Sequence, residues 1–238
     1  MLWNGLNEVL RMAHPHVSAR LRHETLTRSD ALLAARGVIP EVIAARDLAL
    51  GSYPAASQFS DKLFTLPVDA VILSIQADIT DRLVRHKADG FLFYPSEASG
   101  WSEEDRQWLR SDFTATPLLT VEESMANLAE MVDRIRQIRD IPVLIYNLSP
   151  VIPGDFVHCY MGLDETYATR IRRFNLALIE LSQNIGISIV DVDALMARYG
   201  ADRLKLDTVH LTPEGYQRVA EEVVRILDDL GIFDEESA

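Results

Sequence analysis

The stretch that decides the fold prediction is Asp207-Thr208-Val209-His210-Leu211-Thr212-Pro213-Glu214-Gly215-Tyr216, near the carboxyl end of the chain. It places an acid three positions before a histidine, followed by a helix-breaking Pro-Glu-Gly step and an amphipathic helix over residues 217–227. An Asp and a His at this spacing can work together, because the carboxylate holds the imidazole in one tautomer and stabilises its cation. Asp207 and His210 are therefore the candidate orienter and general base of a catalytic site.

Outward from this loop, the chain alternates short apolar runs with amphipathic stretches. The runs at residues 41–45, 69–75, 141–146 and 187–192 are predicted strands. Continuous β-branched runs are typical of strands covered on both faces, as in a parallel sheet. Apolar spacing over 121–139 and 165–184 predicts long helices between them. The pattern predicts an α/β fold, a three-layer α/β/α sandwich with a central parallel sheet and a ligand site at its carboxyl edge.

Three further segments have less regular patterns. Residues 2–12 are predicted to be helical, whereas residues 17–27 form either a first strand leading into a helix at 30–36 or a helix throughout. Residues 91–116 carry Trp101 and Trp108 with little periodicity and are predicted to form an insertion or lid, and residues 228–238 an acidic tail. Because no repeat or linker interrupts the chain, a single domain over residues 1–238 is expected.

The composition excludes several classes of protein. The 238 residues are 48% hydrophobic and 25% charged, as in a globular protein that is soluble. The net charge of −13 argues against nucleic acid or an anionic membrane as partner, because phosphate would be repelled. No run reaches the ~18 apolar residues of a spanning helix, and the first residues lack the pattern of a signal peptide. The lone Cys159 fits a cytoplasmic location.

The block at residues 207–216 resembles the C-terminal block of the SGNH (GDSL-type) hydrolases, which typically contains D-x-x-H-L-t-p-x-G-y. The helix at 165–184 and the strand at 187–191 resemble the segments that precede this block in the family. The resemblance implies an SGNH-type fold and an esterase or acyl transferase with a serine nucleophile, which acts on a small-molecule acyl ester. No cofactor and no metal is expected, and the oligomeric state is left open.

The family's third block is normally a strand that ends in G-x-N-D, and here the equivalent stretch is Ile75-Gln76-Ala77-Asp78. The glycine is replaced, and the asparagine whose amide donates to the oxyanion is missing. An ionised Asp78 accepts hydrogen bonds and cannot donate them, so it would repel a developing negative charge. Gln76 is a substitute donor if it points inward. The resemblance therefore predicts a weakened oxyanion site.

The nucleophile block is also degenerate, since no Gly-Asp-Ser is present. Ser29 lies where the loop after a first strand is expected. Ser52 follows Gly51, which relieves crowding in a tight turn, but leaves too little chain for a second βα unit before Asp69. If Ser29 is the nucleophile, Gly51 instead matches the glycine whose N–H serves the oxyanion hole in the family. Both serines remain candidates.

Each candidate also has a structural interpretation. Ser29 is a suitable helix N-cap and Ser52 a suitable turn residue. His158 and Cys159 suggest a metal-ligand pair or a cysteine nucleophile, but a zinc site is not expected without a second cysteine or a spaced histidine cluster. Two functions follow: an SGNH-type esterase or acyl transferase, or a catalytically silent SGNH-like domain that binds an acyl, glycan or peptide partner.

Overall fold

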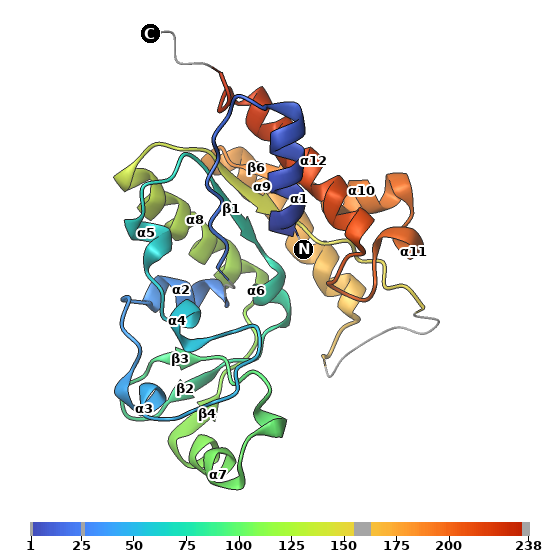
Figure 1. Cartoon of the computed structure of the whole chain (residues 1–238). Helices are drawn as coiled ribbons and strands as arrows, with labels where there is room; N and C mark the ends of the chain where they lie inside the picture. Colours follow the sequence, from blue (N-terminus) through green and yellow to red (C-terminus); the bar gives the residue numbers. More distant parts are fainter. Residues whose placement is uncertain (1, 25–26, 155–162, 235–238) are drawn as a thin grey trace. The chain divides into compact units, whose positions relative to one another are not determined.

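The computed structural model describes residues 2–24, 27–154 and 163–234 (Figure 1). The chain divides into two compact units. We call residues 1–23, 68–76 and 141–238 the parallel-sheet unit, and residues 24–67 and 77–140 the antiparallel-sheet unit. This grouping does not test the expectation of a single domain, which stays a prediction.

The parallel-sheet unit is built on the strands β1 (Val71–Ser74), β5 (Val143–Tyr146) and β6 (Ser188–Val190). They pair in parallel in the order β1-β5-β6, with Ile72 opposite Leu144 and Ile145 opposite Ile189. Leu144 and Ile145 are fully buried, as expected for a central strand that is covered on both faces. The predicted parallel sheet is confirmed, with strands at three of the four predicted places.

The helices of this unit are α1 (Leu2–Ala13), α9 (Tyr167–Ile185), α10 (Val192–Tyr199), α11 (Ala201–Leu204) and α12 (Pro213–Asp229). Helices α1 and α12 lie side by side (Figure 1), and Leu6, Leu10, Val219 and Val223 join one buried cluster. Thr166 caps α9 by accepting from the amide of Thr169, and the helix ends at a glycine in the left-handed conformation. The predicted helices at 2–12, 165–184 and 217–227 are confirmed.

The antiparallel-sheet unit contains β2 (Val84–His86), β3 (Leu92–Phe93) and β4 (Phe113–Ala115), in the order β3-β2-β4. Its longest helix is α8 (Val121–Ile138), which confirms the helix predicted at 121–139 and begins at a capping box formed by Thr120 and Glu123. The other helical segments are α2 (Ser29–Ala34), α3 (Glu41–Ala44), α4 (Ala55–Gln58), α5 (Lys62–Thr65), η1 (Ala98–Gly100) and α7 (Glu103–Asp112). Helix α6 (Gln76–Thr80) also belongs to this unit, except for its first residue, Gln76, which ends the segment 68–76 of the parallel-sheet unit.

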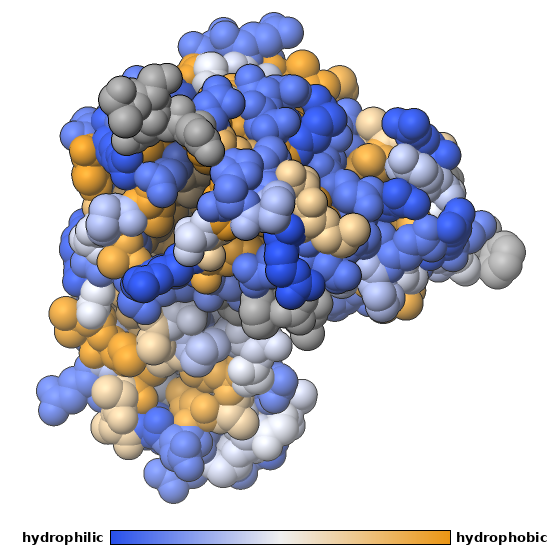
Figure 2. All heavy atoms as spheres, turned by 45° about the horizontal axis from the view of Figure 1, so that its top comes forward, coloured by the Kyte–Doolittle hydropathy of each residue, from blue (hydrophilic) through white to orange (hydrophobic). Residues whose placement is uncertain are grey.

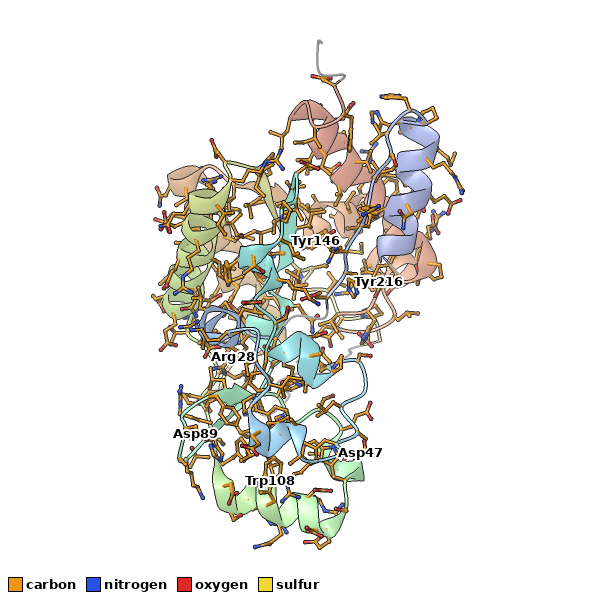
Figure 3. The ribbon with its side chains drawn as sticks, turned by 60° about the vertical axis from the view of Figure 1, so that its left-hand side comes forward. Arg28, Asp47, Asp89, Trp108, Tyr146 and Tyr216 are labelled. Carbon is orange, nitrogen blue, oxygen red and sulfur yellow. The ribbon has the colours of Figure 1, made fainter. Side chains whose placement is uncertain are left out.

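The apolar core of the antiparallel-sheet unit is aromatic. Phe93, Trp101 and Phe113 are buried together with Trp108, whose position on α7 is shown in Figure 3. The rings of Trp108 and Phe113 meet edge to face with their centroids 5.1 Å apart, and the Arg46 guanidinium lies 4.4 Å from the centre of the Trp108 ring. The segment predicted as an insertion or lid, residues 91–116, thus supplies two strands, α7 and much of this core. Its action as a lid stays a prediction.

Two predictions of secondary structure were wrong. Residues 41–45 form α3 and its end, because Pro40 fixes the helix entry and its carbonyl accepts from the amides of Ile43 and Ala44. Residues 17–24 form neither a strand nor a helix, and residues 25 and 26 lie outside the described residues. Of the predicted acidic tail, Asp228 and Asp229 are the last residues of α12, and residues 235–238 lie outside the described residues, so the tail stays a prediction.

The surface carries both hydrophilic and apolar residues (Figure 2), in agreement with a composition that is 48% hydrophobic and 25% charged. Hydrophilic residues alternate with apolar ones on the face drawn in Figure 2. Among the helices that the structure describes, none is long and apolar enough to cross a bilayer.

Candidate active site

The loop that carries Asp207 and His210 is closed by the residues on either side of it. Lys205 and Leu211 form an antiparallel bridge, and the amide of Leu206 donates to the carbonyl of His210 at 2.9 Å. Thr212 then caps α12, because its hydroxyl accepts from the amide of Gly215 at 3.1 Å. The loop is therefore a short hairpin that leads directly into α12.

Gly215 is required in this arrangement by a close approach of the backbone. A Cβ atom at this position would lie 2.3 Å from the carbonyl oxygen of Leu204 and 3.0 Å from the Cβ of Leu211. The Pro-Glu-Gly step of the sequence thus has two separate roles. Pro213 occupies the first turn of α12, where its missing N–H costs nothing, and Gly215 lets the chain before the loop pass over the helix. Figure 3 places Tyr216 in the same turn.

Asp207 and His210 form the predicted hydrogen bond. Oδ2 of Asp207 lies 2.8 Å from Nδ1 of His210, while Oδ1 accepts from the amides of His210 at 2.8 Å and Val209 at 2.9 Å. Partial burial raises the pKa of Asp207, but these three hydrogen bonds outweigh it and hold the pKa below its usual value. The carboxylate is thus ionised and an acceptor only.

The ring of His210 is consequently available as a base. Because an ionised carboxylate only accepts, the proton of a neutral His210 sits on Nδ1 and the lone pair on Nε2. The side chains of His210 and Asp207 are 64% and 54% exposed, and no hydrogen bond within the described part of the chain engages Nε2. This is the geometry of a base and its orienter.

The loop lies at the carboxyl edge of the parallel sheet. Asn147 and Asp191 directly follow β5 and β6, and Nδ2 of Asn147 donates to Oδ1 of Asp191 at 2.8 Å. The ammonium group of Lys205, at the base of the loop, donates to the carbonyl of Ser149, two residues farther along from Asn147, at 2.9 Å. Ligands bind at this edge in open parallel sheets, as predicted for His210. Neither Asn147 nor Lys205 was recognised from the sequence.

Ser29 belongs to a buried polar cluster in the antiparallel-sheet unit. Its side chain is nearly inaccessible, its hydroxyl donates to Oδ2 of Asp78 at 2.7 Å, and its amide donates to Oδ1 at 2.7 Å. Ser124 donates to the same Oδ2 at 2.5 Å, and Nδ2 of Asn127 donates to the Ser29 hydroxyl at 3.0 Å. The hydroxyl of Ser29 is therefore held between a carboxylate and a side-chain amide.

The helix-cap interpretation of Ser29 is wrong. Arg28, which Figure 3 shows at the start of α2, is the N-cap residue, and its own side chain makes no capping hydrogen bond. Ser29 is instead the first residue of α2, and its side chain bonds across the unit to Asp78. The polar contacts of Ser29 therefore link α2, α6 and α8, and the bond from its amide to Asp78 satisfies a donor in the first turn of α2.

Two buried carboxylates lie close together in this unit. Burial raises the pKa of Asp78, and the hydrogen bonds from Ser124 and Ser29 only partly oppose this. Burial also raises the pKa of Asp81 to about 6, although its Oδ1 accepts from the hydroxyl of Thr80. The other carboxylate oxygen of Asp81 has no partner among the described residues. Proton uptake by this pair is therefore easier than by exposed carboxylates.

Ser52 has a simpler environment. It is exposed in a turn in which the amide of Tyr53 donates to the carbonyl of Leu50 at 2.9 Å, so the prediction of an ordinary turn is confirmed. Gly51 has a φ angle of +54°, and a Cβ there would lie 2.0 Å from Oε1 of Glu97. Glycine is thus required at this turn for its conformation.

The remaining candidates contribute less. Gln76 is half-buried at the start of α6, where its backbone N–H donates to the hydroxyl of Ser74. His158 and Cys159 lie outside the described residues. Within the described ranges, no group of three or more His, Cys, Asp or Glu side chains is placed to hold a metal ion.

Comparison with known proteins gives a family match. Residues 93–218, more than half of the chain, match the model of the GDSL-like Lipase/Acylhydrolase family. This range contains Asp207 and His210 and excludes Ser29 and Ser52. No curated protein matches the chain.

One solved structure supports the fold. An alpha/beta hydrolase enzyme from the metagenome of Lake Arreo, Spain, superposes with a TM-score of 0.56 at 16% identity, over 98% of this chain and 83% of that chain. A lipase/acylhydrolase from Enterococcus faecalis (TM-score 0.36, 19% identity) covers 47% of this chain and 53% of its own. A peptidoglycan O-acetylesterase (TM-score 0.41, 13% identity) covers 71% and 39%. The first of these has the same overall fold as this chain.

Proposed function

The chain belongs to the GDSL-like Lipase/Acylhydrolase family, and on that premise we propose that it is a serine esterase or acyl transferase with His210 as general base and Asp207 as its orienter. The observation that carries the proposal is the 2.8 Å contact between Oδ2 of Asp207 and Nδ1 of His210, with Nε2 unoccupied by any described residue. This pair supplies two of the three groups of a nucleophilic triad.

The reaction follows from these roles. A serine Oγ attacks the acyl carbonyl and passes its proton to Nε2 of His210, while Asp207 stabilises the imidazolium that forms. The tetrahedral intermediate collapses when Nε2 returns this proton to the leaving alcohol oxygen. Water, or the hydroxyl of an acceptor, then attacks the acyl-enzyme with the same base, which releases the acid or the transferred ester and restores the serine.

Ser29 is the nucleophile that we favour over Ser52. The hydroxyl of Ser29 is held in one position by Asp78 and Asn127, whereas Ser52 lies in an exposed turn. A fixed hydroxyl supports the proposal, because a reacting atom must be held in position with little freedom left to lose. The partners of Ser29 come from α6 and α8, and their positions depend on the folded core and not on a surface loop.

Two groups are proposed as oxyanion donors. The side-chain amide of Asn127 lies 3.0 Å from the Ser29 hydroxyl, so a carboxamide is present beside the nucleophile although the family's third-block asparagine is absent. The amide of Gly51 is the second, by resemblance to the family's second block. A substrate carbonyl must displace the hydrogen bond between Asn127 and Ser29 before this amide can serve it.

Labelling with a fluorophosphonate tests the proposal. The wild type is expected to label, the His210→Ala and Ser29→Ala variants to lose the label, and the Ser52→Ala variant to keep it. Mass spectrometry of the labelled peptide identifies the modified residue directly. A label on Ser52, or its loss in Ser52→Ala alone, would show that Ser52 is the nucleophile. Circular dichroism of each variant separates loss of chemistry from loss of fold.

One observation favours a second function, a catalytically silent domain that binds an acyl, glycan or peptide partner. The hydroxyl of Ser29 is buried and donates to a carboxylate, so it must be released before it can react. If the wild type does not label at any pH at which it is folded, while acyl esters still bind in calorimetry, the silent domain is the correct function.

A further inference from the structure

We infer that Lys205 is a positioning residue of the proposed site, which fixes the Asp207–His210 loop to the carboxyl edge of the parallel sheet. The inference rests on the proposed function for its catalytic meaning, but its structural basis is independent of which serine reacts. All of the groups involved belong to the parallel-sheet unit.

Lys205 is a buried cation with two fixed acceptors. Only 4% of the residue is exposed, and Nζ donates to the carbonyls of Ser149 at 2.9 Å and Val151 at 2.5 Å. These carbonyls belong to the segment that follows β5. Lysine is almost never buried to this extent without polar partners, because the ammonium group loses its hydration. Its position is thus determined by specific contacts.

The charges near Lys205 belong to the same edge of the sheet. Burial lowers the pKa of Lys205 to about 8, while the carboxylates of Asp193 and Asp207 oppose this shift. Ser149 connects these groups, since its side chain also bonds to Asp193. The ammonium group therefore lies between the sheet edge and the carboxylate that orients His210.

The position of Lys205 in the hairpin makes it the anchor of the loop. Lys205 pairs with Leu211 across the base of the hairpin, so its side chain points into the unit while the next residues carry Asp207 and His210 outward. Leu206 is 64% exposed and Lys205 is not, as expected for neighbours on an extended strand. The side chains of Asp207 and His210 are exposed, whereas Lys205 binds two carbonyls of the segment after β5 and so anchors their loop.

The anchor is expected to act on the tautomer and orientation of the His210 ring. Without it, the hairpin can shift relative to the sheet, and the ring can leave the carboxylate of Asp207. A displacement of about 1 Å at a reacting group costs on the order of 10²-fold in rate. The effect is on kcat, because Lys205 is buried beneath the loop and does not face the substrate.

The test compares Lys205→Met with Arg203→Met. Methionine fills a similar volume and donates no hydrogen bond. Arg203 is an exposed cation two residues away that pairs with Glu214, so its replacement removes a positive charge but not the anchor. Long-range ¹H–¹⁵N spectra of the imidazole rings report the tautomer of His210, which is assigned from the signal that His210→Ala removes. This readout does not require activity.

The wild type and Arg203→Met are expected to show His210 with its proton on Nδ1. Lys205→Met is expected to show a mixture of tautomers and, if the enzyme is active, a fall in kcat of about 10²-fold with KM nearly unchanged. An unchanged tautomer in folded Lys205→Met overturns the inference. If that variant does not fold, Lys205→Gln decides by the same spectra, since its shorter, uncharged side chain cannot reach both carbonyls. A tautomer change in a protein that never labels with fluorophosphonate supports the anchor while refuting the proposed function.

Discussion

Asp207 binds both the backbone and the ring of His210. One carboxylate oxygen accepts from the amide of His210 and the other lies 2.8 Å from Nδ1 of its ring. A single side chain thus sets the turn of the loop and the direction of the imidazole together. This explains why the spacing of three residues matters, since it places the histidine amide and its ring within reach of one carboxylate.

Replacement of Asp207 is expected to damage catalysis less than replacement of His210. In Asp207→Asn, the side-chain oxygen can still accept from the backbone amides, but the NH₂ group cannot accept from Nδ1 of His210. We expect His210→Ala to abolish hydrolysis of p-nitrophenyl acetate and Asp207→Asn to lower kcat by about 10²–10⁴-fold. Asp202→Asn, an exposed carboxylate on α11, is the matched control. Full activity of Asp207→Asn would refute the role of Asp207 as orienter.

The buried Asp78 is expected to limit the rate of the wild type. Its carboxylate accepts the hydrogen of the Ser29 hydroxyl, and the resemblance to the family's third block implies that it lies where the family has an amide. We expect slow turnover of simple esters, below the ~10² s⁻¹ of efficient enzymes. Asp78→Asn should raise kcat by roughly tenfold or more, because one oxyanion donor is typically worth about 10²–10³ in rate. Stopped-flow acylation measures this. A slower Asp78→Asn would mean that the carboxylate itself serves the reaction.

Asp81 is expected to make the stability of the protein depend on pH. Its pKa is raised from 3.8 to about 6, so the folded state holds a proton more tightly than the unfolded state between these values. The contribution of Asp81 is therefore most favourable below the unfolded pKa and is lost as pH rises through the folded pKa. Two pKa units correspond to roughly 3 kcal/mol.

Asp81→Asn removes this dependence, so it should be more stable than the wild type near neutral pH by up to roughly 3 kcal/mol and no more stable below the unfolded pKa. Urea denaturation of the whole protein measures the difference at each pH. The fluorescence of Trp101 and Trp108 reports unfolding of the antiparallel-sheet unit, in whose core they lie. A constant difference across the acid range would show that Asp81 keeps its usual pKa in the folded state.

The sequence predicts the parts of this fold that depend on local patterns. The runs around Val71, Leu144 and Ile189 were recognised as strands, and the central one, β5, is buried on both faces. The run at 41–45 has the same composition, but only Ile43 is buried there, and the preceding proline starts a helix. Composition alone does not distinguish a strand from a short buried helix.

The sequence predicts the candidate site only where its groups lie close together in the chain. Asp207 and His210 share one loop, so their contact follows from spacing. Lys205 was missed because its acceptors are backbone carbonyls of a distant segment, and the sequence does not show which carbonyls a lysine will reach. Asn127 was missed for a similar reason, since a polar residue in an amphipathic helix usually faces solvent, and here it bonds to Ser29 from another helix.

Gly215 provides a test of how the loop is held against α12. Its φ angle is not in the left-handed region, so the requirement for glycine is purely one of space. A methyl group there would lie 2.3 Å from the Leu204 carbonyl oxygen, which is backbone and cannot move alone. That segment continues directly into Lys205, so the hairpin must shift to accommodate Gly215→Ala. We expect a loss of about 1–3 kcal/mol of unfolding free energy, typical of overpacking.

Gly100→Ala is the matched control, because no atom lies within 4 Å of a Cβ at that position and its stability should be nearly unchanged. The shift of the hairpin in Gly215→Ala should also reach His210, since the bridge between Lys205 and Leu211 forms the base of its loop. The ring spectra of His210 and urea denaturation should therefore change together. A variant that loses stability while the His210 tautomer is unchanged would show that the contact between Leu204 and α12 supports the fold without positioning Asp207 and His210.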